Sequence, residues 1–170
     1  MPQLTLALVS AATAASSSFT LGVTGDVNLS PILRGAAPEY VWGDLLDTTR
    51  SLGLMAIQHE GTLAEEHDPN PQTIQFEDPL NYTATYAAAG VDFVSIANNH
   101  QFDYGWEGAV RTQATLATTG IAFGGVGATA ELVRRPTVVP ARRGANAVDV
   151  AFFTVVVDEC WRWPNGSFYL

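Results

Sequence analysis

The sequence predicts an α/β fold built on a mainly parallel β-sheet. Short apolar runs rich in β-branched residues alternate along the chain with segments that have helical periodicity. The clearest run covers residues 91–97 and is apolar at nearly every position, as expected of a strand that is covered on both faces. This alternation is typical of βαβ units, and no internal repeat or linker divides it, so residues 19–170 are expected to form one domain.

The expected strands and helices follow one another in a regular order. Strands are predicted over residues 19–24, 54–57, 91–97, 121–125, 136–140 and 148–157. Helices are predicted over residues 40–52, 81–89 and 106–119, with a short one over 128–133. Gly53 and Gly120 are expected to end the helices before them, because glycine readily adopts the left-handed conformation of a helix C-terminus. The polar residues 65–76 predict a loop that covers the site.

Residues 1–18 are apolar and small, and two interpretations of this leader stay open. Residues 4–15 resemble the hydrophobic region of a signal peptide, and Ala12-Thr13-Ala14 resembles a cleavage site, although no lysine or arginine precedes them. A signal segment would place the protein outside the cell or at its membrane, whereas a simple leader would leave it in the cytoplasm. No apolar run reaches the roughly 18–20 residues of a membrane-spanning helix, so no such helix is expected.

Composition narrows the classes of partner. The 170-residue chain has a net charge of −9, and all eight basic residues are arginine. A nucleic-acid interface needs clustered positive charge, so nucleic-acid binding is not expected. An anionic partner could still bind if metal ions reverse the local charge. Cys160 is the only cysteine, which excludes a disulfide scaffold.

Polar side chains follow three successive predicted strands. Asp26 follows the first strand, Glu60 the second, and Asn99 and His100 the third, with Asp103 close behind. The carboxyl ends of parallel strands lie at one edge of a sheet, so these groups are expected to converge. Two carboxylates, an amide oxygen and an imidazole suit a divalent metal ion such as Mn, Zn, Fe or Mg. Two carboxylates also suit an acid/base pair, as in glycoside hydrolysis, but the adjacent amide and imidazole favour the metal site.

A second interpretation of the Asn98-Asn99 pair is purely structural. Asparagine tolerates the left-handed conformation, and its side chain caps turns, so the pair could simply shape the loop. The position of this loop directly after a buried strand favours an active-site loop instead.

Four segments resemble the CapA/PgsA family of poly-γ-glutamate capsule synthesis proteins. They are Gly25-Asp26, residues 42–44, residues 58–63 (Gln-His-Glu-Gly-Thr-Leu) and residues 95–105 (Ser-Ile-Ala-Asn-Asn-His-Gln-Phe-Asp-Tyr-Gly). The resemblance runs in order over about residues 20–157, and the Asn-Asn-His block is its most specific part. The family is similar to calcineurin-like metallophosphoesterases. The resemblance therefore implies a sandwich of mixed β-sheets flanked by helices, incomplete at its C-terminus in this chain.

The resemblance also implies a role for each candidate residue. Asp26, Glu60 and Asn99 match metal-ligating positions, so a divalent metal ion is the implied cofactor. His100 matches the histidine that contacts the scissile group, and Asp103 matches the acidic residue that follows it. The implied activity is metal-dependent hydrolysis of an anionic polymer, or of another substrate that contains a phosphate or amide group.

The sequence departs from the family pattern in three places. Gln58 stands where the family usually has Asn, and His59 where it has Leu; we expect His59 to point into the core rather than to act as a ligand. No histidine follows His100, whereas the family supplies further histidines from later loops. These departures keep two alternatives open: a non-catalytic component that binds or exports the polymer, and a degenerate or truncated family member.

Overall fold

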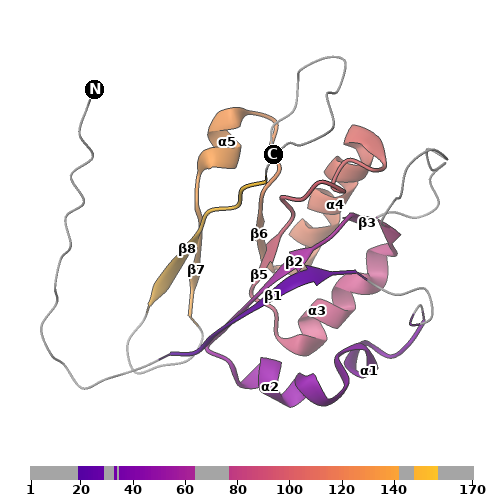
Figure 1. Cartoon of the computed structure of the whole chain (residues 1–170), viewed down its shortest axis with the longest axis vertical. Helices are drawn as coiled ribbons and strands as arrows, with labels where there is room; N and C mark the ends of the chain where they lie inside the picture. Colours follow the sequence, from indigo (N-terminus) through magenta and orange to yellow (C-terminus); the bar gives the residue numbers. More distant parts are fainter. Residues whose placement is uncertain (1–18, 29–32, 34, 64–76, 142–147, 157–170) are drawn as a thin grey trace, which may run out of the picture.

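The computed structural model describes residues 19–28, 33, 35–63, 77–141 and 148–156 (Figure 1). The leader, the loop over residues 65–76, Cys160 and the end of the last predicted strand lie outside these residues. In the described ranges the predicted strands and helices follow one another in the predicted order, and two further short strands at residues 62–63 and 77–78 were not predicted.

The centre of the fold is a four-stranded parallel sheet with the order β1-β2-β5-β6. Its strands are β1 (Leu21–Val27), β2 (Leu54–His59), β5 (Phe93–Ser95) and β6 (Ala122–Gly124). Every neighbouring pair is parallel, so the prediction of a parallel sheet is confirmed. The carboxyl ends of all four strands therefore lie at one edge, which is where the candidate site forms.

Helices connect the strands of this sheet. The helical segments are α1 (Pro38–Trp42), η2 (Gly43–Leu45), α2 (Leu46–Ser51), η3 (Leu80–Tyr82), α3 (Thr83–Ala89), α4 (Gly105–Thr119) and α5 (Ala130–Arg134). The single helix predicted over residues 40–52 is interrupted at Gly43, whose φ of 51° does not belong to a right-handed helix. Gly120 ends α4 in the left-handed conformation, as the sequence predicts.

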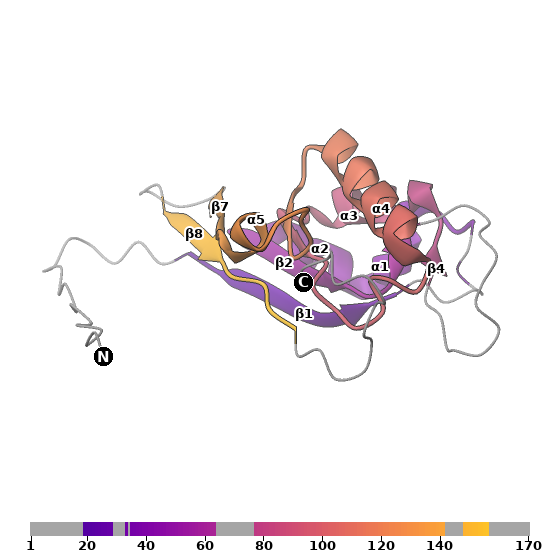
Figure 2. The ribbon, with the colours of Figure 1, turned by 90° about the horizontal axis from the view of Figure 1, so that it is seen from above.

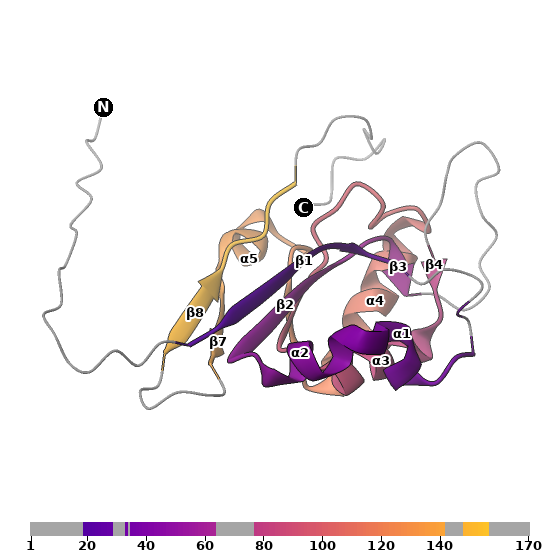
Figure 3. The same ribbon diagram turned by 60° about the horizontal axis from the view of Figure 1, so that its bottom comes forward.

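Two further pairs of strands flank the central sheet. The strands β3 (Thr62–Leu63) and β4 (Glu77–Asp78) are parallel, and both are too short to be recognised from sequence periodicity. The strands β7 (Thr137–Pro140) and β8 (Asp149–Phe152) form an antiparallel pair. Figures 1 and 3 both show this pair beside the amino-terminal half of β1.

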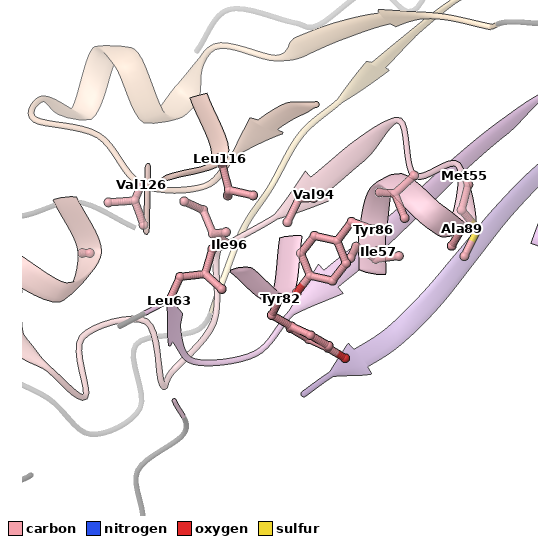
Figure 4. Close-up of a cluster of buried hydrophobic side chains, with 12 residues drawn as sticks. Met55, Ile57, Leu63, Tyr82, Tyr86, Ala89, Val94, Ile96, Leu116 and Val126 are labelled. Atoms are coloured by element: carbon pink, nitrogen blue, oxygen red, sulfur yellow. The ribbon is translucent and has the colours of Figure 1, made fainter. Parts of the chain in front are cut away.

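One face of the central sheet packs against helices. Alternate β2 residues Met55 and Ile57 point to this face, as the two-residue period of a strand requires. They belong to one buried cluster with Tyr86 of α3 and Leu116 of α4, and both of these side chains are fully buried (Figure 4). Figure 2 shows α1–α4 gathered on one side of the molecule, away from β7 and β8. Burial of this apolar face is the main source of stability that the structure shows.

The other face packs against the β7–β8 pair. The intervening β2 residues Leu54 and Ala56 point to this face and cluster with Phe93 and Val139. Phe93 also stacks on Phe152, with ring centroids 4.1 Å apart and planes inclined by 6°. The central sheet thus has helices on one face and a second, antiparallel layer on the other, and this second layer leaves Leu21 and Val23 of β1 exposed. This arrangement confirms the predicted α/β class and is consistent with a metallophosphoesterase-like sandwich.

None of the helices in the described ranges combines the length and apolar character that crossing a bilayer would require.

Candidate functional site at the carboxyl edge of the sheet

The ends of β2 and β5 come together at the carboxyl edge of the sheet. The N–H of Glu60 donates to the carbonyl oxygen of Val27, 3.0 Å away, which extends the β1–β2 pairing past the end of β2. Nε2 of His100 lies 4.0 Å from Oε1 of Glu60. The topology rule for parallel strands thus places two side chains in contact although they are forty positions apart in the sequence.

A β-bulge decides where Asp26 points. Val23 lies opposite Ala56, but Asp26 lies opposite Gln58, so β1 has one residue more than β2 over this interval. Residues opposite each other in a sheet point to the same face, and an extra residue therefore exchanges the two faces. Asp26 consequently shares the face of Gln58 and is exposed, whereas Val27 joins the helix-facing core. Without the bulge, Asp26 would lie opposite the fully buried His59.

The site carries an excess of negative charge. Partial burial raises the pKa of Glu60, and the nearby carboxylates of Asp26 and Asp103 raise that pKa further. His100 opposes this shift, because a positively charged imidazole stabilises the ionised carboxylate. Asp26 is therefore close enough to influence Glu60, and three carboxylates share this region with one imidazole.

The imidazole of His100 is held by Asp103. Its Nδ1 lies 2.8 Å from Oδ2 of Asp103, and both side chains are largely buried. A carboxylate accepts only from a protonated nitrogen, so Nδ1 carries the hydrogen and the neutral ring has its lone pair on Nε2. Nε2 is the nitrogen that faces Glu60. The contact thus sets both the orientation and the tautomer of His100.

The two adjacent asparagines have different environments. Asn98 is buried, and its Oδ1 accepts from the N–H of His100 at 2.9 Å and of Gly61 at 3.3 Å. Its Nδ2 donates to the carbonyl oxygen of His59 at 2.8 Å. Asn99, the residue that the resemblance assigns to the metal, is exposed at the same edge. The turn-capping interpretation therefore describes Asn98, and Asn99 has the access that a ligand needs.

Gln101 contributes to the site although no sequence motif marks it as a functional residue. It is fully buried, and in the amide orientation that satisfies its neighbours it donates to the carbonyl oxygens of Ile96 (3.1 Å) and Gly61 (3.2 Å). A glutamine beside a polar turn is typical of exposed loops, so the sequence carries no signal of its burial.

His59 lies in the core, as predicted. It is fully buried, and its Nδ1 is 2.7 Å from the hydroxyl of Tyr86 and 3.8 Å from Oδ2 of Asp78. Burial lowers the pKa of His59 to about 4, so the ring is neutral near pH 7. Burial, and then the charge of Asp78, raises the pKa of Tyr86, whose phenol therefore keeps its proton and can donate it to Nδ1. Nε2 of His59 then carries the hydrogen, and it has no hydrogen-bond partner within the described part of the chain.

The donors at this edge match a divalent cation in chemical type. Within the described ranges, no group of three or more His, Cys, Asp or Glu side chains is assembled closely enough to hold a metal ion. Asp26 and Glu60 nevertheless offer carboxylate oxygens and Asn99 an amide oxygen, which are the donors that Mg²⁺ and Mn²⁺ prefer. Burial is the largest cause of the raised pKa of Glu60, and the charges of Asp26 and Asp103 raise this pKa further; a cation would offset these charges. The residues present therefore fit such an ion by charge and donor chemistry.

A separate hollow lies at the opposite, amino-terminal edge of the sheet. Its lining includes Val91, Asp92, Gly120 and Val139. Oδ2 of Asp92 already accepts from the N–H of Met55 at 2.9 Å, so this carboxylate serves the fold. The hollow shares no lining residue with the acidic cluster at the carboxyl edge.

Comparison with known proteins assigns the family. No curated protein matches the chain. Residues 20–167 match the family described as bacterial capsule synthesis protein PGA_cap, which confirms the resemblance seen in the sequence motifs. The matched region contains every candidate site residue. The chain therefore belongs to the PGA_cap family of bacterial capsule synthesis proteins.

Proposed function

We propose that this capsule synthesis protein acts on poly-γ-glutamate, or on a related anionic substrate, through a metal-dependent hydrolase site at the carboxyl edge of its sheet. The observation that carries the proposal is the arrangement of Glu60, His100 and Asp103, with the imidazole 4.0 Å from one carboxylate and 2.8 Å from the other. An imidazole between a cation-binding carboxylate and an orienting carboxylate is suited to proton transfer at a bound substrate.

Each residue has a distinct part in the proposal. Asp26, Glu60 and Asn99 would hold a divalent cation, which supplies Lewis acidity and activates water near neutral pH when it is bound. The cation would also offset the negative charge that otherwise repels an anionic polymer. Asp103 keeps the hydrogen on Nδ1 of His100. Nε2 of His100 would accept the proton that the attacking water gives up and, once protonated, would stabilise developing negative charge or donate to the leaving group.

Metal-dependent stabilisation tests the proposal. Purified wild type is heated with and without Mn²⁺, beside Asp26→Asn and Glu60→Gln, which remove charge without changing side-chain size. Asp149→Asn and Glu39→Gln make the same changes at exposed carboxylates of β8 and α1 and serve as controls. Mn²⁺ at one hundred times its dissociation constant would raise the free energy of unfolding by about 2.7 kcal/mol. The two site variants are expected to lose this response, and the two controls to keep it.

Turnover is measured on the same samples. Release of nitrophenol from a nitrophenyl phosphodiester and shortening of poly-γ-glutamate report phosphoester and amide hydrolysis. A folded wild type that shows neither Mn²⁺ stabilisation nor turnover would refute the hydrolase proposal.

One observation favours a second function, a non-catalytic component that binds or exports the polymer. This observation is that the described residues contain no preassembled group of three metal-binding side chains. In this case the chain would bind poly-γ-glutamate without shortening it, and His100→Ala would bind as well as wild type. Polymer binding with no loss of chain length would therefore separate this function from hydrolysis.

A further inference from the structure

Two buried amide side chains, those of Asn98 and Gln101, form hydrogen bonds with the backbone next to Glu60. Nδ2 of Asn98 donates to the carbonyl oxygen of His59, and Oδ1 of Asn98 accepts from the N–H of Gly61. These two backbone groups lie immediately before and after Glu60 in the chain. One side-chain amide therefore bonds to both sides of the residue that carries the central carboxylate.

The same side chains hold the His100 turn. Oδ1 of Asn98 also accepts from the N–H of His100 at 2.9 Å, so a single oxygen binds the backbones of Gly61 and His100. Gln101 adds a second link from the turn, because its amide donates to the carbonyl oxygen of Gly61 and to that of Ile96. Both polar backbone groups of Gly61 are thus bonded to side chains of the turn that carries His100.

The conformation of Gly61 explains why such bonds are needed. Gly61 is buried and has a φ of 92°, which L side chains rarely adopt. The chain turns sharply here directly after Glu60, and a buried turn needs a partner for each of its polar backbone groups. Asn98 and Gln101 provide these partners in a region from which water is excluded, since their exposed fractions are 6% and 0%.

We propose that Asn98 and Gln101 are positioning residues that set the distance between Glu60 and His100, and so determine how tightly this edge binds a divalent cation. This inference rests on the proposed function, and it assigns different tasks to the two adjacent asparagines. Asn98 hydrogen-bonds to the backbone on both sides of Glu60 and to the backbone of His100, and so connects these two segments. Asn99 is exposed to solvent at the same edge. Neither positioning residue is among the proposed ligands of the cation.

Amide hydrogen exchange tests the bonds without any metal. In wild type, the N–H groups of Gly61 and His100 are expected to be protected. Asn98→Leu removes the shared acceptor at similar volume, and both amides are expected to lose protection together. Asn98→Asp keeps an acceptor oxygen but loses the donor to His59, and it is expected to restore protection of both amides. Rapid exchange of the two amides in wild type would overturn the inference, and this measurement needs no variant to fold.

Calorimetric titration with Mn²⁺ separates positioning from a general structural role. Asn98→Leu is expected to weaken Mn²⁺ binding by about 10–100-fold, the range found when a partner behind the metal ligands is removed. Asn98→Asp is expected to bind more tightly than Asn98→Leu. The control is Trp42→Phe, which removes the bond between Nε1 of Trp42 and the carbonyl oxygen of Thr85 and so loosens the α1–α3 contact instead. It is expected to lower the melting temperature and leave the Mn²⁺ affinity unchanged.

The two experiments distinguish failure of this inference from failure of the proposed function. If Asn98→Leu and Trp42→Phe reduce Mn²⁺ affinity equally at a similar loss of melting temperature, Asn98 has only a structural role. If wild type binds no Mn²⁺ although both amides are protected and respond together to Asn98→Leu, the bonds between the two turns stand. In that case the proposed metal-dependent function fails, and with it the role of these bonds in cation binding.

Discussion

The buried imidazole of His59 makes the stability of this protein depend on pH in a predictable direction. The pKa of His59 is lowered from an ordinary value of 6.5 to about 4 in the folded chain, because burial disfavours the charged ring. The unfolded chain therefore binds a proton near pH 6.5, whereas the folded chain binds it only near pH 4. The contribution of the neutral His59 ring to the free energy of unfolding is fully present above pH 6.5. It falls as the pH is lowered towards 4 and is lost below that value.

The size of this effect follows from the shift. One pKa unit corresponds to about 1.4 kcal/mol, so the shift of His59 corresponds to about 3 kcal/mol, most of which is lost by pH 4.5. The carboxylate of Asp78, 3.8 Å from Nδ1, favours the charged ring and makes this figure an upper bound. We therefore expect His59 to account for about 2 kcal/mol of lost stability between pH 7 and pH 4.5.

Urea unfolding of wild type and of His59→Leu at pH 7, 5.5 and 4.5 measures this contribution. All other titrating groups are shared by the two chains, so the difference between their pH profiles isolates His59. The variant is expected to lose about 2 kcal/mol less than wild type on acidification. A second variant, His59→Leu with Tyr86→Phe, avoids leaving the Tyr86 hydroxyl without its partner in the core. Parallel pH profiles for wild type and both variants would show that His59 is not held neutral by burial.

Three further predictions test the packing and the proposed chemistry. Gly125→Ala is expected to destabilise the fold by about 1–3 kcal/mol or more in thermal unfolding, because Gly125 has a φ of 124° and a Cβ there would lie 2.5 Å from the backbone nitrogen of Ala97. Gly25→Ala, where a Cβ meets nothing within 4 Å, is the matched control and should change stability little; an equal loss in both would contradict the steric argument. Leu116→Ala removes a fully buried side chain and is expected to cost about 2–5 kcal/mol in urea unfolding, whereas a cost below about 1 kcal/mol would mean that α4 packs loosely. His100→Ala is expected to lower Mn²⁺-dependent hydrolysis by about 10²–10⁴-fold while Mn²⁺ still stabilises the protein, and unchanged turnover would exclude His100 from proton transfer.

Much of the fold could be predicted from sequence because the signals are local. The apolar run around Val94 predicts its strand, and Gly120 predicts the end of α4, from only a few neighbouring residues. The meeting of Glu60 and His100 needed one further rule, the common edge of parallel strands. By contrast, the pairing of β3 with β4 rests on two residues in each strand and leaves no periodic pattern.

The sequence could not predict which residues of the site are buried and which are exposed, because this depends on geometry that residue types do not encode. Asn98 and Asn99 are chemically identical neighbours, and only the course of the turn buries one and exposes the other. Gln101 looks like a surface residue until the turn brings it to the backbone of Gly61. For Asp26 the sequence indicated the carboxylate, but not the bulge that decides which face of the sheet the carboxylate occupies.

That bulge means that the candidate site depends on the register of β1 as well as on residue identities. If β1 kept its length but paired regularly with β2 beyond Val23, Asp26 would lie opposite His59, its carboxylate would turn inward and the side chain of Val27 would turn outward. A relative with one residue fewer between the counterparts of Val23 and Asp26 needs no bulge, because its aspartate then lies opposite the counterpart of Gln58 in a regular pairing. When family members are compared, the number of residues that precede this aspartate in the first strand therefore shows whether a bulge is needed to keep the aspartate on the same face.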